Sequence, residues 1–551
     1  MASSSGGRAS MKTALYSRVL PQVRSGVFAL ALFGATVAFA PSGASAQVTA
    51  FKQSVAEFAA NEDAVAKFYR ESAYTPIWTA PGEESMQRRA ALLRALEEAS
   101  AHGLPDQSAL AASLMEQMRN ARSARDLGQI EAALSTAYVN YATDLQTGLL
   151  DPGSIDDGIV RKKHTTDPVT YLEGIRDNQP MAYMRSLVPA SPQYRALLRE
   201  KFRLEQLVAK GGWGTTVPKG KLEPGDTGPA VIALRDRLVA MGYLTRSATA
   251  AFDMDVEQAV QKFQSDHGLE VDGVAGDGTI AELNKPVTER LKSVVVAMER
   301  ERWLSPERGE RHILVNQTDF TAKIVDRGDV TFETRSVIGK NQHDRRSPEF
   351  SDVMEHMIIN PSWHVPRSII TKEYLPKLRN NPNAVRHILI TDRQGRVVDR
   401  NSADFSQYTR SNFPYSMRQP PSRSNALGLV KFMFPNKYNI YLHDTPQKSL
   451  FSREVRAFSH GCIRLAQPFE FAYALLARQT EDPKAFFQRI LSSGKETKVE
   501  LEQKVPVHII YRTAYVSGKG RAEFRRDVYG RDAKVWDALQ RAGVALPGVQ
   551  G

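Results

Sequence analysis

The stretch AFSHGCIRLAQP, residues 457–468, holds the only cysteine of the 551-residue chain, Cys462. One cysteine cannot form a disulfide within its own chain, so it is either a small buried apolar residue or a group kept for its reactivity. Its neighbours, Ser-His-Gly before it and Ile-Arg after it, are the residues that decide between these two interpretations.

A reactive cysteine needs a proton partner, because the thiolate is the nucleophile and a free thiol has a pKa of about 8.5. Two histidines are candidates. His460 lies two positions before Cys462 and would point to the same side if the segment is extended. His443 lies nineteen positions before Cys462 and can reach it only if its strand runs beside this loop. The sequence leaves the choice open.

Gly461 precedes the cysteine, allows an unusual backbone angle and lets a substrate approach closely. The amides of Gly461 and Cys462 are natural donors to an oxyanion, each worth about 3 kcal/mol of barrier. Arg464 is a candidate ligand for a substrate carboxylate, and a structural salt bridge is the alternative.

The region around this stretch is predicted to be rich in β-strands. Short runs with β-branched residues, several of them alternating, are separated by turn-forming residues: HILVN at 312, TAKIV at 321, EHMII at 355, NIYLH at 439 and VHIIY at 507. Residues 340–435 between them are rich in Pro and Asn and contain one helical stretch near 375–378. Such a long insertion is either a lid over a site or an ordinary surface excursion.

The N-terminal half is predicted to be helical. From about 50 to 210 the apolar residues recur at three- and four-residue steps, with glycines after the ends of the runs. A Gly- and Pro-rich linker follows at 211–229, and then a compact unit of three short helices, the first opened by Pro229. No catalytic constellation occurs in the first region, so its expected role is a scaffold.

The first residues are typical of a secretory signal. Basic residues precede an apolar run at 27–40, and Ala44-Ser45-Ala46 resembles a cleavage site. An uncleaved anchor is the alternative, and Met11 is a candidate true start. No later stretch is as long and apolar as a membrane span. The net charge of +12 suits an acidic polymer, but the basic residues are scattered, so no nucleic-acid partner is expected.

Two sets of motifs resemble known families. The segment GDTGPAVIALRDRLVAMGYL with VEQAVQKFQSDHGLEVDGVAGDGTIAEL resembles the three-helix peptidoglycan-binding domain of bacterial wall enzymes, with a helical spacer as the alternative. YLHDTP followed by SHGCIRL is similar to the signature of YkuD-type L,D-transpeptidases, H-x(14 to 17)-[ST]-H-G-C-x-[RN]. With MERERW, NPSWHVP, NALG and KFMFPN, the chain resembles the long YcbB-like branch, whose catalytic domain carries a capping insertion.

This resemblance implies acyl transfer in two halves. The Cys462 thiolate attacks the carbonyl of the third stem residue, usually diaminopimelate, and terminal D-alanine leaves with a proton from His443. The side-chain amine of a second stem then resolves the thioester, which forms a 3-to-3 cross-link. L,D-carboxypeptidase hydrolysis, D-amino-acid exchange and lipoprotein attachment share the same acyl-enzyme and remain alternatives. The resemblance further implies acylation of Cys462 by carbapenems.

The resemblance also assigns site residues. They are Cys462 and His443 as catalytic groups, Gly461, His460, Ser459 and Asp444 as oxyanion or supporting groups, and Arg464, Tyr441 and Trp363 as substrate-binding groups. In some relatives a serine follows the histidine, whereas Asp444 stands here, so either a side chain or a backbone carbonyl orients His443. Tyr441 and Trp363 are pocket walls or, alternatively, core aromatics.

We therefore expect a multidomain α+β chain. Its parts are a signal peptide at 1–46, a helical scaffold domain at 47–215, a peptidoglycan-binding domain at 222–285, a linker helix at 286–310, a β-rich, β-sandwich-like catalytic domain at 311–512 with a capping insertion at 340–435, and a C-terminal extension at 513–551. The expected setting is the periplasm, and the expected partners are peptidoglycan stem peptides and glycan.

A monomer without metal or cofactor is expected, and other wall-synthesis enzymes are further candidate partners. Two rival hypotheses belong to other classes. One is a zinc peptidase with His443, His460 and Cys462 as ligands, and the other is a non-catalytic wall-binding scaffold.

Overall fold

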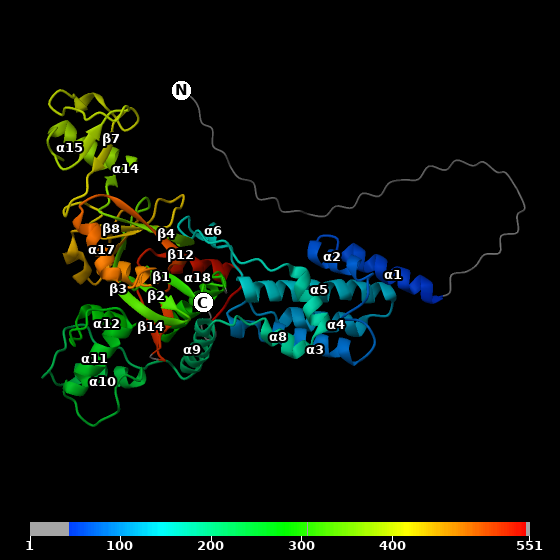
Figure 1. Ribbon diagram of the computed structural model, residues 1–551. Coiled ribbons are helices and arrows are strands. Elements are labelled where there is room, and N and C mark those ends of the chain that lie inside the picture. Colours follow the sequence, from blue (N-terminus) through cyan, green and yellow to red (C-terminus); the bar gives the residue numbers. More distant parts are fainter. Residues whose placement is uncertain (1–42, 306, 519, 547–551) are drawn as a thin grey trace, which may run out of the picture.

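The computed structural model describes residues 43–305, 307–518 and 520–546. It confirms the predicted α+β organisation: a helical N-terminal region, a small three-helix module and a β-rich C-terminal region (Figure 1). The predicted signal segment lies almost entirely in residues 1–42, with Met11, and so falls outside the described residues. No helix in the described part of the chain has both the length and the apolarity of a membrane span.

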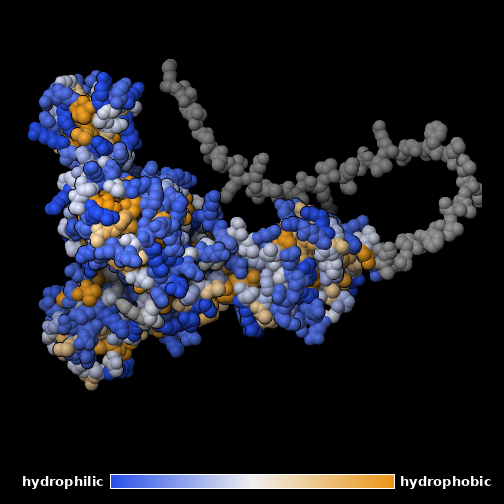
Figure 2. All heavy atoms as spheres, in the orientation of Figure 1, coloured by the Kyte–Doolittle hydropathy of each residue, from blue (hydrophilic) through white to orange (hydrophobic). Residues whose placement is uncertain are grey.

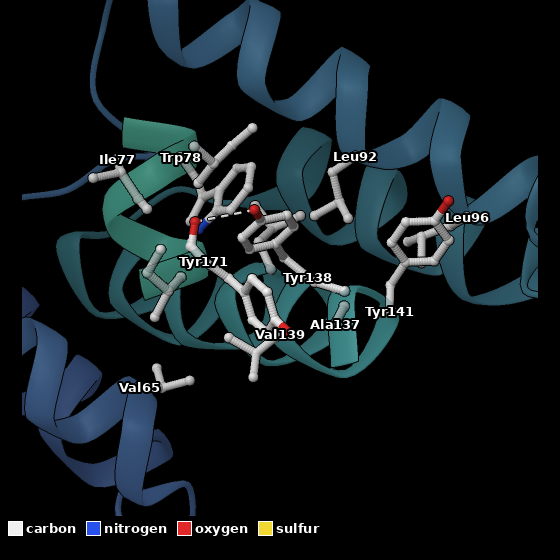
Figure 3. Packing of buried hydrophobic residues seen from close by; sticks show 14 of the residues in the cluster. Val65, Ile77, Trp78, Leu92, Leu96, Ala137, Tyr138, Val139, Tyr141 and Tyr171 are labelled. Atoms are coloured by element: carbon white, nitrogen blue, oxygen red, sulfur yellow. Dashed lines mark hydrogen bonds between the residues drawn. The ribbon is translucent and has the colours of Figure 1, made fainter. Parts of the chain in front are cut away.

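Most of the N-terminal helices pack around one buried cluster of aromatic and aliphatic side chains (Figure 3). At its centre Trp78 donates from Nε1 to Ser135 Oγ at 2.8 Å, and Tyr138 donates to the Tyr171 carbonyl at 3.0 Å. These bonds satisfy the polar atoms of large rings that are buried. The helices that contribute to it are α1 (Gly43–Phe58), α2 (Asp63–Glu71), α3 (Glu83–Glu97), α4 (Ser108–Asn120), α5 (Ala124–Thr147), α7 (Pro168–Asp177) and α8 (Pro180–Ser186). Two further helices, α6 (Pro152–Ile155) and α9 (Pro192–Ala209), belong to a second apolar cluster.

The three-helix module consists of α10 (Pro229–Ala240), α11 (Met254–Asp266) and α12 (Asp277–Leu283). Pro229 occupies the first position of α10, where its missing N–H costs nothing. The Asp253 side chain accepts from the Val256 amide and caps α11. Phe263 is fully buried among the apolar faces of the helices.

Helix α13 (Val287–Arg302) contacts several parts of the molecule and is more than a linker. It packs against α9, against α18 (Arg531–Arg541) and against β13 (Ala514–Val516). Its polar side chains form buried ion pairs with other parts of the chain, such as Arg300 with Glu349 at 2.8 Å and with Asp532 of α18 at 2.5 Å. Removing one partner of such a pair leaves an unpaired buried charge, so these contacts fix the relative positions of the parts.

The β-rich region is built on one nine-stranded sheet in the order β10-β3-β11-β9-β8-β4-β12-β1-β2. Strand β2 also pairs with β3, so the predicted sandwich-like domain is a single sheet that folds back on itself around one core. Helices α16 (Pro468–Leu476) and α17 (Pro483–Ser492) add to this core. The strands are β1 (Arg311–Asn316), β2 (Thr321–Asp326), β3 (Asp329–Gly339), β4 (Phe350–Ile359), β8 (Val430–Met433), β9 (Leu442–His443), β10 (Ala457–Ser459), β11 (Ile463–Leu465) and β12 (Thr497–Ile510).

A separate small body, which we call the cap, projects from one end of this sheet (Figure 1). It contains a three-stranded sheet and its own apolar cluster. Its elements are β5 (Trp363–His364), α14 (Arg367–Ile369), a π-helical turn (Ile370–Tyr374), α15 (Leu375–Asn380), β6 (Leu389–Thr391) and β7 (Ser416–Gln419).

The cap is shorter than the predicted insertion at 340–435. Strands β4 and β8 both fall within that range, yet both are internal strands of the main sheet with buried apolar side chains. The chain leaves the sheet after Ile359 and returns at Val430, and these two residues face each other in the β4–β8 pair. The insertion therefore comprises residues 360–429.

The residues after β12 form the hairpin of β13 with β14 (Ala522–Phe524), followed by α18. They pack on α13 and on the sheet region, as shown by the fully buried Arg531, whose guanidinium pairs with Glu349. The face of the molecule seen in Figure 2 is mainly hydrophilic, and apolar residues show on it as separate patches.

Candidate active site

The neighbouring strands β9 and β11 bring the two halves of the sequence signature together. They pair in parallel, with Leu442 opposite Ile463 and His443 opposite Arg464. Leu442 and Ile463 are fully buried in the sheet core. Because side chains alternate along a strand, His443 and Arg464 point to the other face. The condition under which His443 could reach the cysteine, a strand running beside the loop, is met.

That face opens into a cavity of about 740 Å³ between the sheet and the cap. Seven of the predicted site residues line it: Trp363, Tyr441, His443, Ser459, His460, Cys462 and Arg464. A second cavity of about 760 Å³ lies between the three-helix module, strands β2 and β3 of the main sheet and the β13–β14 hairpin, and its described lining contains neither cysteine nor histidine. The chemistry therefore selects the cavity beneath the cap.

The Cys462 thiol is half-buried and donates to the Asn439 carbonyl at 3.5 Å. Burial raises the pKa of this thiol to about 11, although hydrogen bonding from Tyr441 and the charges of Arg464 and Lys431 act in the opposite direction. Among the described residues no hydrogen bond joins the thiol to His443. The cysteine is thus a neutral thiol at neutral pH.

The His443 ring is buried, and its Nδ1 lies 2.5 Å from the backbone carbonyl oxygen of Asp444. A carbonyl only accepts, so Nδ1 carries the hydrogen and Nε2 is the nitrogen that can exchange a proton. Burial, with the charge of Arg464, lowers the pKa of His443 to about 3. His443 is therefore a neutral base in the resting site.

The group next to His443 is the backbone of Asp444 and not its side chain. The Asp444 carboxylate accepts from the amides of Leu429 and Thr445 at 2.9 and 2.7 Å, and from Lys448 Nζ at 2.6 Å. These contacts brace the turn after β9. Of the two alternatives that the sequence left open, the structure has the backbone carbonyl.

The loop before Cys462 differs from the expectation at Gly461. Its amide donates to Ser459 Oγ at 3.1 Å, so it is not free to bind an oxyanion. Ser459 Oγ in turn donates to the Cys462 carbonyl. No partner is found for the Cys462 amide among the described residues. Gly461 has a φ of 114°, which side-chain-bearing residues rarely adopt.

His460 also differs from the expectation, because the turn at Gly461 means that residues 460–462 are not extended. His460 Nε2 lies 2.6 Å from Glu373 Oε1, on the cap. Glu373 also accepts from Arg345 at 2.9 Å. His460 therefore connects the loop to the cap rather than to the thiol.

Three residues form walls of the cavity. Arg464 donates to Gln447 at 2.7 Å, forms no ion pair within the described residues and has a buried Nε without a partner. Tyr441 stacks edge-to-face on His443 at 5.6 Å between ring centroids, and burial raises its pKa well above the usual range. Trp363 both lines the cavity and belongs to the apolar cluster of the cap, so its two interpretations are compatible.

Sequence reasoning missed four residues around the nucleophile: Ser347, Glu373, Asn439 and Tyr529. Ser347 donates to the Gly461 carbonyl at 2.6 Å and accepts from the Gly339 amide at 3.0 Å. Asn439 has a φ of 54°, and its place in the turn PNKYN is the one available signal, because Asn tolerates the left-handed region. The others are marked only by their tertiary contacts.

Within residues 43–305, 307–518 and 520–546 no group of three or more His, Cys, Asp or Glu side chains is arranged to hold a metal ion.

Comparisons with known proteins agree with this division of the chain. Residues 63–200 match a scaffold domain, residues 227–283 a putative peptidoglycan binding domain, and residues 310–509 an L,D-transpeptidase catalytic domain. A protein of Haemophilus influenzae named "Putative L,D-transpeptidase" is 34% identical over 239 residues. The alignment covers 42% of this chain and 47% of the relative, so the chain spans about half the length of that relative.

Two similar crystal structures are an L,D-transpeptidase (residues 123–326) from Xylanimonas cellulosilytica and an L,D-transpeptidase (Yku) from Stackebrandtia nassauensis. Each shares 15% identity with this chain and covers 54% of it, and the matches cover 98% and 97% of those two chains. The TM-scores are 0.17 and 0.20.

Proposed function

We propose that this chain, which contains a YkuD L,D-transpeptidase catalytic domain and a peptidoglycan-binding domain, is an exported enzyme that joins peptidoglycan stem peptides through an acyl-enzyme on Cys462. The observation that carries the proposal is the cavity beneath the cap that Cys462 and His443 share: His443 ends β9, and Cys462 directly precedes the neighbouring strand β11. Peptidoglycan is the proposed substrate of the catalytic cavity and the proposed ligand of the three-helix module.

In the first half-reaction the Cys462 sulfur attacks the carbonyl carbon of the third residue of a tetrapeptide stem. A C–S bond forms, and the C–N bond to the terminal D-alanine breaks. The thiol proton passes to Nε2 of His443 and from there to the leaving nitrogen, so one imidazole acts as base and then as acid. The products are a thioester and free D-alanine.

The resting site must rearrange before this step. The thiol donates to the Asn439 carbonyl, so it has to rotate toward Nε2 of His443 as the substrate enters. Catalytic hydrogen bonds that are absent without substrate commonly form in the complex. Since the thiol pKa is about 11 and the imidazole pKa about 3, a resting ion pair is unfavourable, and proton transfer accompanies attack on the carbonyl.

In the second half-reaction the side-chain amine of an acceptor stem attacks the thioester. A new amide bond forms, the C–S bond breaks, and the amine proton returns through His443 to the sulfur. The product is a 3-to-3 cross-link. Attack by water instead gives the carboxypeptidase reaction, attack by a D-amino acid gives exchange, and attack by a lipoprotein amine gives lipoprotein attachment. We propose that the cap selects among these acceptors by limiting access to the cavity.

Arg464 is the proposed ligand for a substrate carboxylate. Its guanidinium lines the cavity beside the sulfur, has no carboxylate partner among the described residues and keeps a buried Nε without a bond. A carboxylate that accepts from the guanidinium would satisfy this donor. Tyr441 and Trp363 would provide apolar walls for the stem peptide.

The direct test is incubation of the mature chain with tetrapeptide muropeptides and identification of the products by mass spectrometry. We expect loss of D-alanine with a cross-linked dimer, and no product from Cys462→Ala or His443→Ala. Activity that survives a strong chelator but is destroyed by a thiol alkylator would exclude the zinc peptidase, and inactivation by the chelator would favour it. Binding to sacculi without any product, from chain with a reduced thiol, would favour the wall-binding scaffold.

The proposed site of action is outside the cytoplasm, in the periplasm, because peptidoglycan is found there. The domain boundaries that we propose follow from the sequence, with the insertion shortened to 360–429. We further propose that the chain acts as a monomer.

A further inference from the structure

In the peptide bond between Gly461 and Cys462, the carbonyl group is hydrogen-bonded, whereas the N–H has no partner among the described residues. The Gly461 carbonyl accepts a hydrogen bond from Ser347 Oγ at 2.6 Å. The amide of the same peptide bond belongs to Cys462 and has no partner among the described residues. In a trans peptide the carbonyl and the N–H point in opposite directions, so fixing the carbonyl also fixes the direction of the N–H.

Ser347 is itself held at every polar atom. Its hydroxyl accepts from the Gly339 amide at 3.0 Å while it donates to Gly461. Its amide donates to the hydroxyl of Tyr529 at 3.3 Å, and its carbonyl accepts from Arg531 at 3.0 Å. Ser347 is fully buried, so water does not compete for these bonds.

Tyr529 and Arg531 belong to the segment after the matched catalytic domain. The Tyr529 hydroxyl donates to the Gly339 carbonyl at 2.6 Å, next to the bond that it accepts from Ser347. The Arg531 guanidinium is fully buried and also pairs with Glu349. Gly530 between them has a φ of 70°, which turns the chain so that both side chains reach Ser347.

We propose that Ser347, clamped by Tyr529 and Arg531, is a positioning residue that aims the Cys462 amide at the oxyanion formed during acyl transfer. This inference rests on the proposed acyl-enzyme at Cys462. Of the two amides that the sequence suggested as oxyanion donors, that of Gly461 is already bound to Ser459, which leaves the amide of Cys462. The C-terminal extension is then a part of the catalytic apparatus.

The test compares two reactions of the same sulfur. Acylation by a carbapenem creates negative charge on a carbonyl oxygen, whereas alkylation by iodoacetamide occurs at a saturated carbon and creates no oxyanion. Loss of an oxyanion donor typically slows acylation about 10²–10³-fold, so we expect a roughly tenfold to hundredfold loss for Ser347→Ala and about tenfold for Tyr529→Phe. Alkylation should keep its native rate in both.

Turnover of the tetrapeptide muropeptide provides a second readout. Since the bond is made only in the transition state, kcat should fall while KM stays unchanged. The matched control is Tyr515→Phe, which removes a hydroxyl of the same extension that bonds to Glu523 and not to Ser347. Thermal unfolding would reveal whether Ser347→Ala folds. If it does not, Tyr529→Phe, which removes the hydroxyl bound to the Ser347 amide, tests the same inference.

Equal loss of acylation and alkylation would show that Ser347 only supports the thiol, and would overturn the inference. Native acylation rates in both variants would overturn it as well. If the proposed function is wrong, the native chain itself would form no acyl adduct with the carbapenem on Cys462. That result would also overturn this inference, and it differs from the two results above because the native chain fails as well.

Discussion

Arg464 faces His443 directly across the parallel β9–β11 pair, and its guanidinium lowers the pKa of both the His443 imidazole and the Cys462 thiol. Both effects would serve the proposed acyl transfer, because a lower imidazole pKa keeps His443 unprotonated and a lower thiol pKa favours the Cys462 thiolate. Arg464 thus has an electrostatic part in the site besides its proposed contact with substrate.

Replacing Arg464 by Gln should raise both pKa values. The thiolate fraction at neutral pH would fall, and we expect iodoacetamide to alkylate Cys462 at least about threefold more slowly, which corresponds to half a pKa unit. The measurement is the alkylation rate from neutral to alkaline pH. Arg478→Gln removes an arginine outside the cavity, paired with Asp326, and should leave the profile unchanged. An unshifted profile in Arg464→Gln would contradict the assignment.

The native thiol should titrate far above neutrality. Burial raises the pKa of Cys462 to about 11, so the thiolate fraction, and with it the alkylation rate, should increase about tenfold per pH unit without levelling before that value. The denatured chain is the control, because an exposed thiol has a pKa of about 8.5 and its rate levels earlier. A native profile that coincides with the denatured one would show that the thiol is not desolvated.

Gly461 should not tolerate a side chain. Its φ of 114° is strained for alanine, and a Cβ there would lie 3.2 Å from Cδ1 of Ile440. We expect Gly461→Ala to destabilise the chain by about 1–3 kcal/mol and to lower acyl transfer about a hundredfold. Thermal unfolding and muropeptide turnover measure the two effects. The control Gly395→Ala tests a positive φ of 78° on the cap with open space around it, and should affect stability alone.

Glu373 should control how well the cap excludes water. It joins the cap to the sheet region by accepting from Arg345 and contacting His460. These groups are partly exposed, so Glu373→Gln should change stability by less than about 1 kcal/mol. We expect the ratio of hydrolysed to cross-linked product to rise severalfold. The ratio in Asp392→Asn, which breaks an ion pair within the cap, should stay native; an equal rise in both would implicate the cap fold and not this contact.

In the N-terminal helices, Glu131 should be essential for stability. This fully buried carboxylate accepts from the amides of Ile77, Trp78 and Thr79 and from the hydroxyls of Tyr69 and Thr79. In Glu131→Gln, an NH2 group replaces one carboxylate oxygen and faces N–H or O–H groups that also need an acceptor. The substitution should therefore lower the free energy of unfolding by about 3 kcal/mol or more. Urea unfolding measures it, with the exposed Glu98→Gln as control. Alkylation of Cys462 in the folded variant should be unaffected.

Local chemistry in the sequence predicted much of this molecule. The three- and four-residue apolar steps, Pro229 and the β-branched runs predicted helices and strands that the structure contains. The run NIYLH was only partly right, because Asn439 begins a left-handed turn and just Leu442–His443 form a strand. The bounds of the insertion were too wide even though the run EHMII, which is part of β4, was predicted as a strand. Only the pairing of β4 with β8 shows that both belong to the main sheet.

The site was predictable to the extent that it lies in one motif. The type and spacing of His443 and Cys462 suggested a pair, and the β9–β11 pairing places both in one cavity. Ser347, Glu373 and Tyr529 were missed because their roles come from hydrogen bonds between residues that are 28 to 190 positions apart in the chain. No local pattern encodes such contacts.

The cap begins and ends on a single rung of the β4–β8 ladder, where Ile359 faces Val430. The cap thus takes the place of the loop of a β4–β8 hairpin. A short turn between Ile359 and Val430 would leave the register of the two strands unchanged. The cap can therefore be exchanged or change in length during evolution without a change in the part of the main sheet that positions Cys462 and His443. Acceptor choice and bond-making chemistry would then be inherited as separable traits.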